Sequence, residues 1–126
     1  MPKVASQPLL SVRDVPRASR WYQAVLAADS GHGGDEYERI VSEGVLVLQL
    51  HALEEEHHHG PLADPSRPFG NGVAVWFELD DLDAAAARAR KIAAEVVTPI
   101  HTNPNAHHRE LWLRDPDGYL VVLAGK

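Results

Sequence analysis

Two stretches of the sequence echo one another at a constant spacing, and this echo constrains the fold more than any other feature. The motif VRDV at residues 12–15, with Ala18 three positions later, corresponds to LDDL at 79–82, with Ala85 three positions later. The shift, from 12 to 79, is 67 residues for every matched pair. An internal duplication of this size predicts that the chain contains two copies of one supersecondary unit.

The first copy begins with a strand that leads into a helix. Asp14 is a favourable N-cap, and Pro16 suits the first helical turn, where its missing N–H costs nothing. Apolar residues recur every three to four positions up to about Ala28, before a glycine-rich loop. Glu43 and Gly44 form the predicted turn between two apolar segments. The predicted strands are residues 7–12, 37–42 and 45–51.

The second copy contains an alanine-rich helical pattern. Asp80 or Asp81 caps a helix that continues to about Ala94, and its interior is rich in alanine, the best helix former. The sequence DPDG at 115–118 is a strong turn signal. The predicted strands of this copy are residues 73–79, 95–102, 109–114 and 119–124.

The order of elements is therefore a strand, a helix and about three strands, repeated once. We expect one domain over residues 1–126, made of two βαβββ halves at about 5–51 and 73–125 that are joined by a loop at 52–72. Several strands are apolar on both faces, which predicts an α+β fold with a curved mixed sheet. Helices should cover the convex side of this sheet, and the concave side should form a ligand cleft.

Charge and composition exclude several classes of function. The chain has no cysteine, and its formal net charge is −6, with the basic residues scattered along it. Nucleic acid is excluded as a partner, since binding to phosphates needs clustered Lys and Arg. Disulfides, thiolate metal sites and a cysteine nucleophile are excluded as well. No run approaches 18 apolar residues and the N-terminus lacks signal-peptide blocks, so we expect a cytoplasmic protein with no membrane partner.

Two motifs make the chain resemble the vicinal oxygen chelate superfamily, which has the glyoxalase/bleomycin resistance protein/dioxygenase fold. The first is Val12-Arg13-Asp14 followed by the aromatic pair Trp21-Tyr22, and the second is the DPDG turn at 115–118 followed by a strand. The resemblance covers nearly the whole chain. It implies a paired βαβββ fold, a homodimer, and a cleft that holds a small-molecule ligand.

The resemblance also places the four usual metal-binding positions of the superfamily. They fall on Gln7, Gln49, Ala74 and Val122. Two of these side chains are neutral amides, which are weak ligands for a divalent cation, and the other two offer no ligand atom. We therefore expect no metal at the usual site and predict no cofactor; a divalent metal would need a non-standard site of His and Glu residues.

Glu110 and His51 are the candidates for such a relocated site or for catalysis. Strand alternation places His51 on the same face as Gln49, so both should face the cleft. A carboxylate in a central strand needs a partner when it is buried. Glu110 is therefore either a general base, or one arm of a site with His51 or a loop histidine, or the partner of Arg109 or Arg114 in a salt bridge.

The remaining candidates for ligand contact are aromatic or histidine side chains in the second half. By alternation, Trp112 and His108 share the face of Glu110, and Trp76 points away from the face of Phe77. Trp76 and Trp112 either stack on a planar ligand or fill the core. The consecutive histidines at 57–59 are either a metal clip or pH-sensitive lid, or part of a solvated loop.

The function expected from these features is binding and sequestration of an aromatic or amphipathic molecule, as in the bleomycin resistance branch that the chain resembles. The alternative is a lyase, isomerase or dioxygenase that uses a relocated His and Glu site. A third reading is a regulatory or accessory subunit. The sequence contains no phosphate-binding glycine loop, nucleophile elbow or zinc-protease helix.

Overall fold

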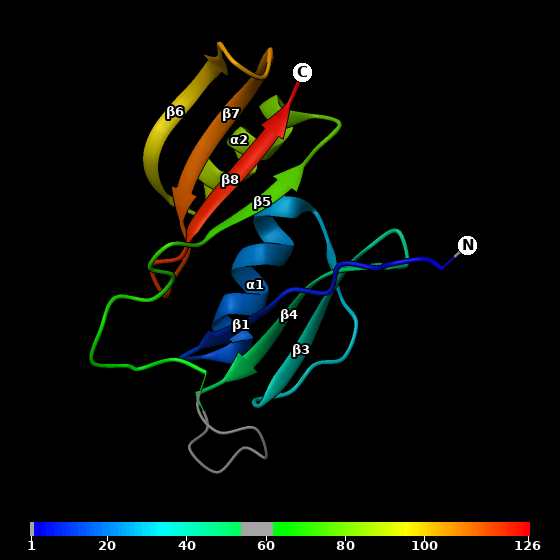
Figure 1. The fold of residues 1–126 in the computed structure, drawn as a ribbon, viewed down its shortest axis with the longest axis vertical. Coiled ribbons are helices and arrows are strands. Elements are labelled where there is room, and N and C mark those ends of the chain that lie inside the picture. Colours follow the sequence, from blue (N-terminus) through cyan, green and yellow to red (C-terminus); the bar gives the residue numbers. More distant parts are fainter. Residues whose placement is uncertain (1, 54–61) are drawn as a thin grey trace.

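The computed structural model describes residues 2–53 and 62–126 and has the repeated order that the duplication predicts (Figure 1). The first module contains β1 (Leu9–Val12), α1 (Val15–Leu26), β2 (Asp29–Ser30), β3 (Tyr37–Ser42) and β4 (Val45–Ala52). The second module contains β5 (Ala74–Glu78), α2 (Leu82–Lys91), β6 (Glu95–Asn103), β7 (His108–Arg114) and β8 (Leu120–Gly125).

Each module forms its own four-stranded mixed sheet. The strand order is β1-β4-β3-β2 in the first sheet and β5-β8-β7-β6 in the second. In both sheets the first strand of the module runs parallel to the last, and the other neighbours are antiparallel. The α+β class and the two βαβββ modules are thus confirmed. The two sheets follow each other along the long axis of the molecule (Figure 1).

The sequence echo has a direct structural counterpart at the start of each helix. The Asp14 side chain accepts a 3.0 Å hydrogen bond from the backbone N–H of Arg17, and the Asp81 side chain accepts one of the same length from Ala84. These two aspartates are the N-caps of α1 and α2. The capping carboxylate satisfies a helix donor that has no partner within the helix.

Several predicted boundaries differ from the structure at the ends of elements. The strand predicted at 7–12 begins only at Leu9, so Gln7 precedes it and is exposed. The helix predicted to reach about Ala94 ends at Lys91, and Ala93 adopts a φ of 53° that no α-helix continues. The short strand β2 lies at the start of the segment predicted as a glycine-rich loop.

Side chains on the helix-facing side of each sheet form the core. α1 packs on β3 and β4, α2 packs on β7 and β8, and the two helices contact each other. The buried residues at the heart of this core include Tyr22, Leu48, Leu50, Leu113 and Leu123. Burial of such side chains is the main term that stabilises the two layers of each module.

The turn at 115–118 connects the second module to the first. The backbone N–H of Arg13 donates a 2.8 Å hydrogen bond to Oδ1 of Asp117, and the Tyr119 hydroxyl donates one of 2.8 Å to the carbonyl of Ser11. Tyr22 donates to Asp115 in the same region. This turn therefore fixes the start of α1 as well as the hairpin between β7 and β8.

The described part of the linker, residues 62–73, contains turns and neither a helix nor a strand. Phe69 is buried in it, 5.8 Å from the Tyr119 ring between centroids, and the Arg13 guanidinium lies 4.1 Å from the Phe69 ring centroid. The linker is thus anchored at the module boundary. None of the helices in the described ranges is long and apolar enough to cross a membrane.

Candidate functional site

The face of the second sheet that points away from α2 gathers most of the predicted site residues, and we call it the second open face. Alternation along β7 sends Leu111 and Leu113 to the helix side and the intervening residues to this face. The strand register brings Trp112 next to Val122, and Val122 next to Trp76. The residues on this face that concern the site are Ala74, Trp76, His101, Asn103, His108, Glu110, Trp112 and Val122.

Glu110 is the centre of this face. It is 1% exposed, and its carboxylate accepts three hydrogen bonds: from Asn103 Nδ2 at 2.6 Å, from His108 Nε2 at 2.7 Å and from Trp112 Nε1 at 2.8 Å. A second imidazole, that of His101, lies 4.0 Å from Oε1. Every donor comes from β6 or β7, so the cluster depends on the pairing of these two strands.

The hydrogen bonds decide the charge of Glu110. Burial acts to raise the pKa of this carboxyl, but the three hydrogen bonds and the charge of His108 together outweigh it, so the pKa of Glu110 lies below its ordinary value. Glu110 is therefore an ionised acceptor whose oxygens are already engaged. A general base needs an oxygen that is open to the substrate proton, so this arrangement does not suit that role.

The predicted alternative of a salt bridge to arginine is wrong. Arg109 points to the helix side and pairs with Asp83 of α2 at 2.8 Å. Arg114 donates a 3.1 Å hydrogen bond to the carbonyl of Gly118. The partners of Glu110 are instead neutral donors and an imidazole, which the sequence did not single out apart from His108 and Trp112.

His108 is the residue on the second open face whose chemistry Glu110 determines. An ionised carboxylate only accepts hydrogen bonds, so Nε2 of His108 carries a hydrogen, and whenever the ring is neutral Nδ1 is its acceptor nitrogen. The ring is half-buried, and its centroid lies 5.9 Å from the Trp76 ring. His108 and Trp76 also line a hollow of about 530 Å³ together with Glu78 and Asp80.

The two tryptophans of this face differ in exposure. Trp76 is 50% exposed, whereas Phe77, its neighbour on β5, is buried against the helix side. Alternation therefore works as predicted for this pair. Trp112 is half-buried, held by Glu110 through its indole nitrogen, and its ring centroid lies 6.2 Å from that of His101. Both indoles are thus available from the open side of the sheet and absent from its core.

The corresponding face of the first sheet, the first open face, carries the other predicted residues. The Tyr37 hydroxyl donates a 2.5 Å hydrogen bond to Oε1 of Gln49, and Nε2 of Gln49 donates one of 3.0 Å to the backbone carbonyl of Gln7. His51 lies opposite Tyr37 in the register of β3 and β4, and its Nδ1 is 2.8 Å from the carbonyl of Ala52. Gln49 and His51 therefore share one face, as alternation predicts.

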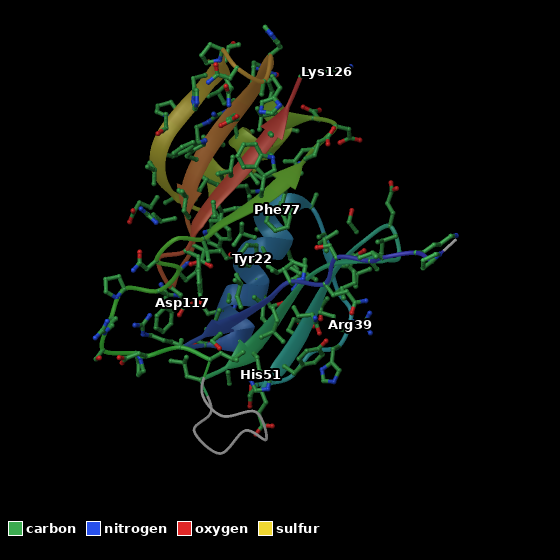
Figure 2. All side chains as sticks on the ribbon, viewed as in Figure 1. Tyr22, Arg39, His51, Phe77, Asp117 and Lys126 are labelled. Atoms are coloured by element: carbon green, nitrogen blue, oxygen red, sulfur yellow. The ribbon has the colours of Figure 1, made fainter. Side chains whose placement is uncertain are left out.

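The two open faces belong to separate modules. His51 lies at the end of the first module that is farthest from β7 along the long axis of the molecule (Figures 1 and 2). Glu110 therefore does not form a site with His51 in a single chain. The described residues contain no group of three His, Asp or Glu side chains that could hold a metal ion. The histidines at 57–59 lie outside the described residues.

The residues at the four usual metal positions of the superfamily do not fit a divalent ion. Ala74 and Val122 offer no ligand atom, and Oε1 of Gln49 already accepts the hydrogen bond from Tyr37. Gln7 precedes β1 instead of lying in it. Lewis-acid chemistry at this position would need carboxylate or imidazole ligands that these residues do not supply.

Sequence reasoning missed three residues of the two faces. His101 falls at the end of the strand predicted at 95–102, and Asn103 falls in the turn predicted after it, although β6 includes Asn103; only the pairing of β6 with β7 brings both to Glu110. Tyr37 is the first residue of the strand predicted at 37–42, and its hydroxyl has no predicted role. A long-range register was needed to find all three, since nothing in the local sequence indicates which strand pairs with which.

Comparisons with known proteins agree with the fold of two βαβββ modules. The sequence model of the Glyoxalase/Bleomycin resistance protein/Dioxygenase superfamily matches residues 5–123. The search of curated proteins gives no match. Three of the solved structures that share the fold along nearly the whole chain illustrate the match. TioX from Micromonospora sp. ML1 has a TM-score of 0.75 at 18% identity, covering 98% of both chains.

The other two structures have names that describe an activity. The fosfomycin resistance protein FosX from Mesorhizobium loti has a TM-score of 0.70 at 20% identity, covering 100% of this chain and 94% of its own. A lactoylglutathione lyase from Agrobacterium tumefaciens has a TM-score of 0.71 at 20% identity, covering 98% and 94%. Identities this low show the fold alone. From the match over residues 5–123, the chain belongs to the Glyoxalase/Bleomycin resistance protein/Dioxygenase superfamily.

Proposed function

We propose that the protein binds a small planar molecule, aromatic or amphipathic, on the second open face and sequesters it without the metal chemistry of its superfamily. The observation that carries this proposal is the pair of indoles, Trp76 and Trp112, on the open side of the second sheet. The buried carboxylate of Glu110 holds the Trp112 indole in place by a hydrogen bond. Rigid aromatic side chains give a large contact area at a low entropic cost.

The polar groups of this face support the orientation of such a ligand. Glu110 holds the His108 ring by its Nε2, which leaves Nδ1 to accept a hydrogen bond from the ligand. Ligand sites combine apolar walls with a few polar groups in fixed positions, and this face has that composition. The exposed Ala74 adds apolar surface at a position where metal enzymes of the superfamily need a ligand.

Assembly into a two-fold symmetric homodimer is part of the proposal. Both open faces lack a covering layer within the described chain, and β5 and β6 expose Trp76, Val96 and Val97 to more than 40%. Exposed apolar surface of this kind favours closure by a second copy. Sedimentation equilibrium at micromolar concentration tests this: a dimer is expected, and a monomer contradicts it.

Native mass spectrometry of the purified protein, followed by release of any retained molecule, tests the binding proposal. We expect an adduct of small-molecule mass, and we expect Trp76→Ala to lose it. Phe77→Leu, next in sequence but on the helix side, is the matched control and should keep the adduct. An adduct that survives Trp76→Ala together with Trp112→Ala contradicts the proposed site.

A second candidate function is acid–base catalysis by His108, and one observation favours it. A histidine whose one nitrogen is held by a buried carboxylate is a common general base. Turnover of the retained molecule that is lost in His108→Gln, with binding preserved, would favour this enzyme reading. Release of the retained molecule in unchanged form favours sequestration.

A further inference from the structure

A hollow between the two modules is lined by three arginines and an indole, and none of its lining residues is among the site residues named above on the two open faces. Its walls come from α1, from the segment that joins α2 to β6, and from the end of β7 with the turn that follows. Its volume is about 460 Å³, which lies within the range of small-molecule sites. We call it the arginine hollow; its lining residues are Arg17, Arg20, Trp21, Ile92, Ala93, Ala94, Glu95, Arg114, Asp115 and Pro116.

Two of the arginines have no partner within the described part of the chain. Arg17 and Arg20 lie three residues apart on α1, and neither guanidinium makes a hydrogen bond or salt bridge there. Like charges at this spacing repel each other, because residues three apart are neighbours on a helix surface. Trp21 follows Arg20 and is half-buried.

The third arginine reaches the hollow from the other module. Arg114, the last residue of β7, is half-buried and uses Nη1 to donate to the Gly118 carbonyl at 3.1 Å. This bond fixes the side chain and leaves the other donors of the guanidinium for a ligand. The hollow thus offers donors from both modules.

The carboxylates in the hollow do not neutralise these charges. Asp115 is 5% exposed and accepts hydrogen bonds from the Tyr22 hydroxyl and from the backbone N–H groups of Asp117 and Tyr119. Its charge is therefore directed into the turn. Glu95 is exposed and has no partner among the described residues. The hollow is therefore lined by three arginines and by one carboxylate that is open to solvent, in a protein whose net charge is −6.

We propose that the arginine hollow binds a small organic anion, a carboxylate or a phosphate ester carried on an aromatic or apolar body. Guanidinium groups bind the oxygens of both anions through paired hydrogen bonds. The Trp21 indole, with Ile92, Ala94 and Pro116, supplies apolar wall for the body of the ligand. Because the ligand contacts α1 and β7 together, it stabilises the contact between the modules.

The three tryptophans of the chain make the site directly testable by NMR. Each contributes one indole N–H signal, and single Trp→Phe variants assign the signals of Trp21, Trp76 and Trp112. We expect phenyl phosphate and benzoate to shift the Trp21 signal with saturation, at concentrations below any that shift the other two signals. Inorganic phosphate, which lacks the apolar body, and benzyl alcohol, which lacks the charge, should bind at least about tenfold more weakly.

Substitution then separates the hollow from general charge effects. Arg17→Gln combined with Arg20→Gln should weaken phenyl phosphate binding by about tenfold or more. Arg39→Gln removes the same charge from an exposed arginine of β3, which is labelled apart from the module boundary in Figure 2, and should change nothing.

Three results would overturn the inference. The first is the absence of saturation up to about 10 mM phenyl phosphate, which corresponds to no useful affinity. The second is equal binding of benzyl alcohol. The third is a shift of the Trp76 and Trp112 signals in place of Trp21; the anion would then bind on the second open face, and the proposed function would stand without the arginine hollow.

Discussion

The hydroxyl of Tyr22 donates a 2.6 Å hydrogen bond to Oδ2 of Asp115, and this buried contact ties the helix of the first module to the turn that closes the second. Both side chains are at most 5% exposed. Burial, and then the neighbouring charge of Asp115, raises the pKa of Tyr22 well above its ordinary value. The phenol is therefore a permanent donor, and the pair is a buried polar link between the modules.

Loss of this link should lower stability. Tyr22→Phe removes the hydroxyl but keeps the ring, and it leaves a buried carboxylate with only its two backbone donors. We expect the free energy of unfolding to fall by about 1–3 kcal/mol, measured by urea titration. A double-mutant cycle with Asp115→Asn should give a coupling energy of at least about 0.5 kcal/mol. Additive effects of the two substitutions would show that the bond contributes nothing.

Glu38 should make the protein sensitive to acid. It is 3% exposed, and it holds Ser19, Ser30 and the backbone N–H groups at residues 32 and 33 by hydrogen bonds. Burial acts to raise its pKa, but the hydrogen bonds outweigh burial and lower the pKa from 4.5 to about 2. Between these values the unfolded state binds the proton and the folded state does not, so stability is lost as pH falls through this window.

The measurement is the stability of native protein and Glu38→Gln at several pH values. The variant should be less stable by about 1.5–3 kcal/mol at pH 7, and the difference should shrink towards pH 2. Glu36→Gln, two residues earlier and exposed, is the control and should follow the native curve. A difference that is constant with pH would contradict the lowered pKa.

The same stability measurement tests the cluster around Glu110 when the substitution Glu110→Gln removes the charge of this carboxylate. Glu110→Gln places an amide N–H₂ group where Asn103, His108 and Trp112 all present donors, so one or two of these hydrogen bonds must break. We expect a loss of about 1–3 kcal/mol and a shift of the Trp112 indole signal. Glu78→Gln, on an exposed residue of β5, is the matched control. An unchanged Trp112 signal would show that the cluster does not hold the indole.

Much of this architecture could be predicted because its signals are local. The capping aspartates Asp14 and Asp81, the Glu43-Gly44 turn and the alternation of Trp76 with Phe77 each depend on residues close in sequence. The cluster around Glu110 could not be predicted in full, because Asn103 and His101 reach it through strand register. The division of the strands into two sheets likewise depends on contacts between distant segments.

The metal content of the protein should reflect the residues at the four usual metal-binding positions of the superfamily. Because Ala74 and Val122 supply no ligand and Gln49 is engaged by Tyr37, we expect purified protein to contain less than one divalent ion per chain by elemental analysis. One tightly bound ion per chain that disappears in Gln49→Ala would contradict this. An ion that disappears only in His108→Ala would point to the second open face instead.

Two glycines of the linker allow a matched test of how tightly it is anchored. Gly70 and Gly72 both have positive φ, 76° and 83°, which costs an L-residue about 1 kcal/mol. A Cβ at Gly70 would lie 2.7 Å from Cδ1 of Tyr119, whereas a Cβ at Gly72 would meet nothing within 4 Å. Tyr119 cannot give way easily, since its hydroxyl is bonded to Ser11 and its ring packs on Phe69. Gly72→Ala should therefore lower the free energy of unfolding by about 1 kcal/mol, and Gly70→Ala by about 1–3 kcal/mol more. If the two variants lose the same free energy of unfolding, measured by thermal or urea unfolding, the linker moves away from Tyr119 at no cost.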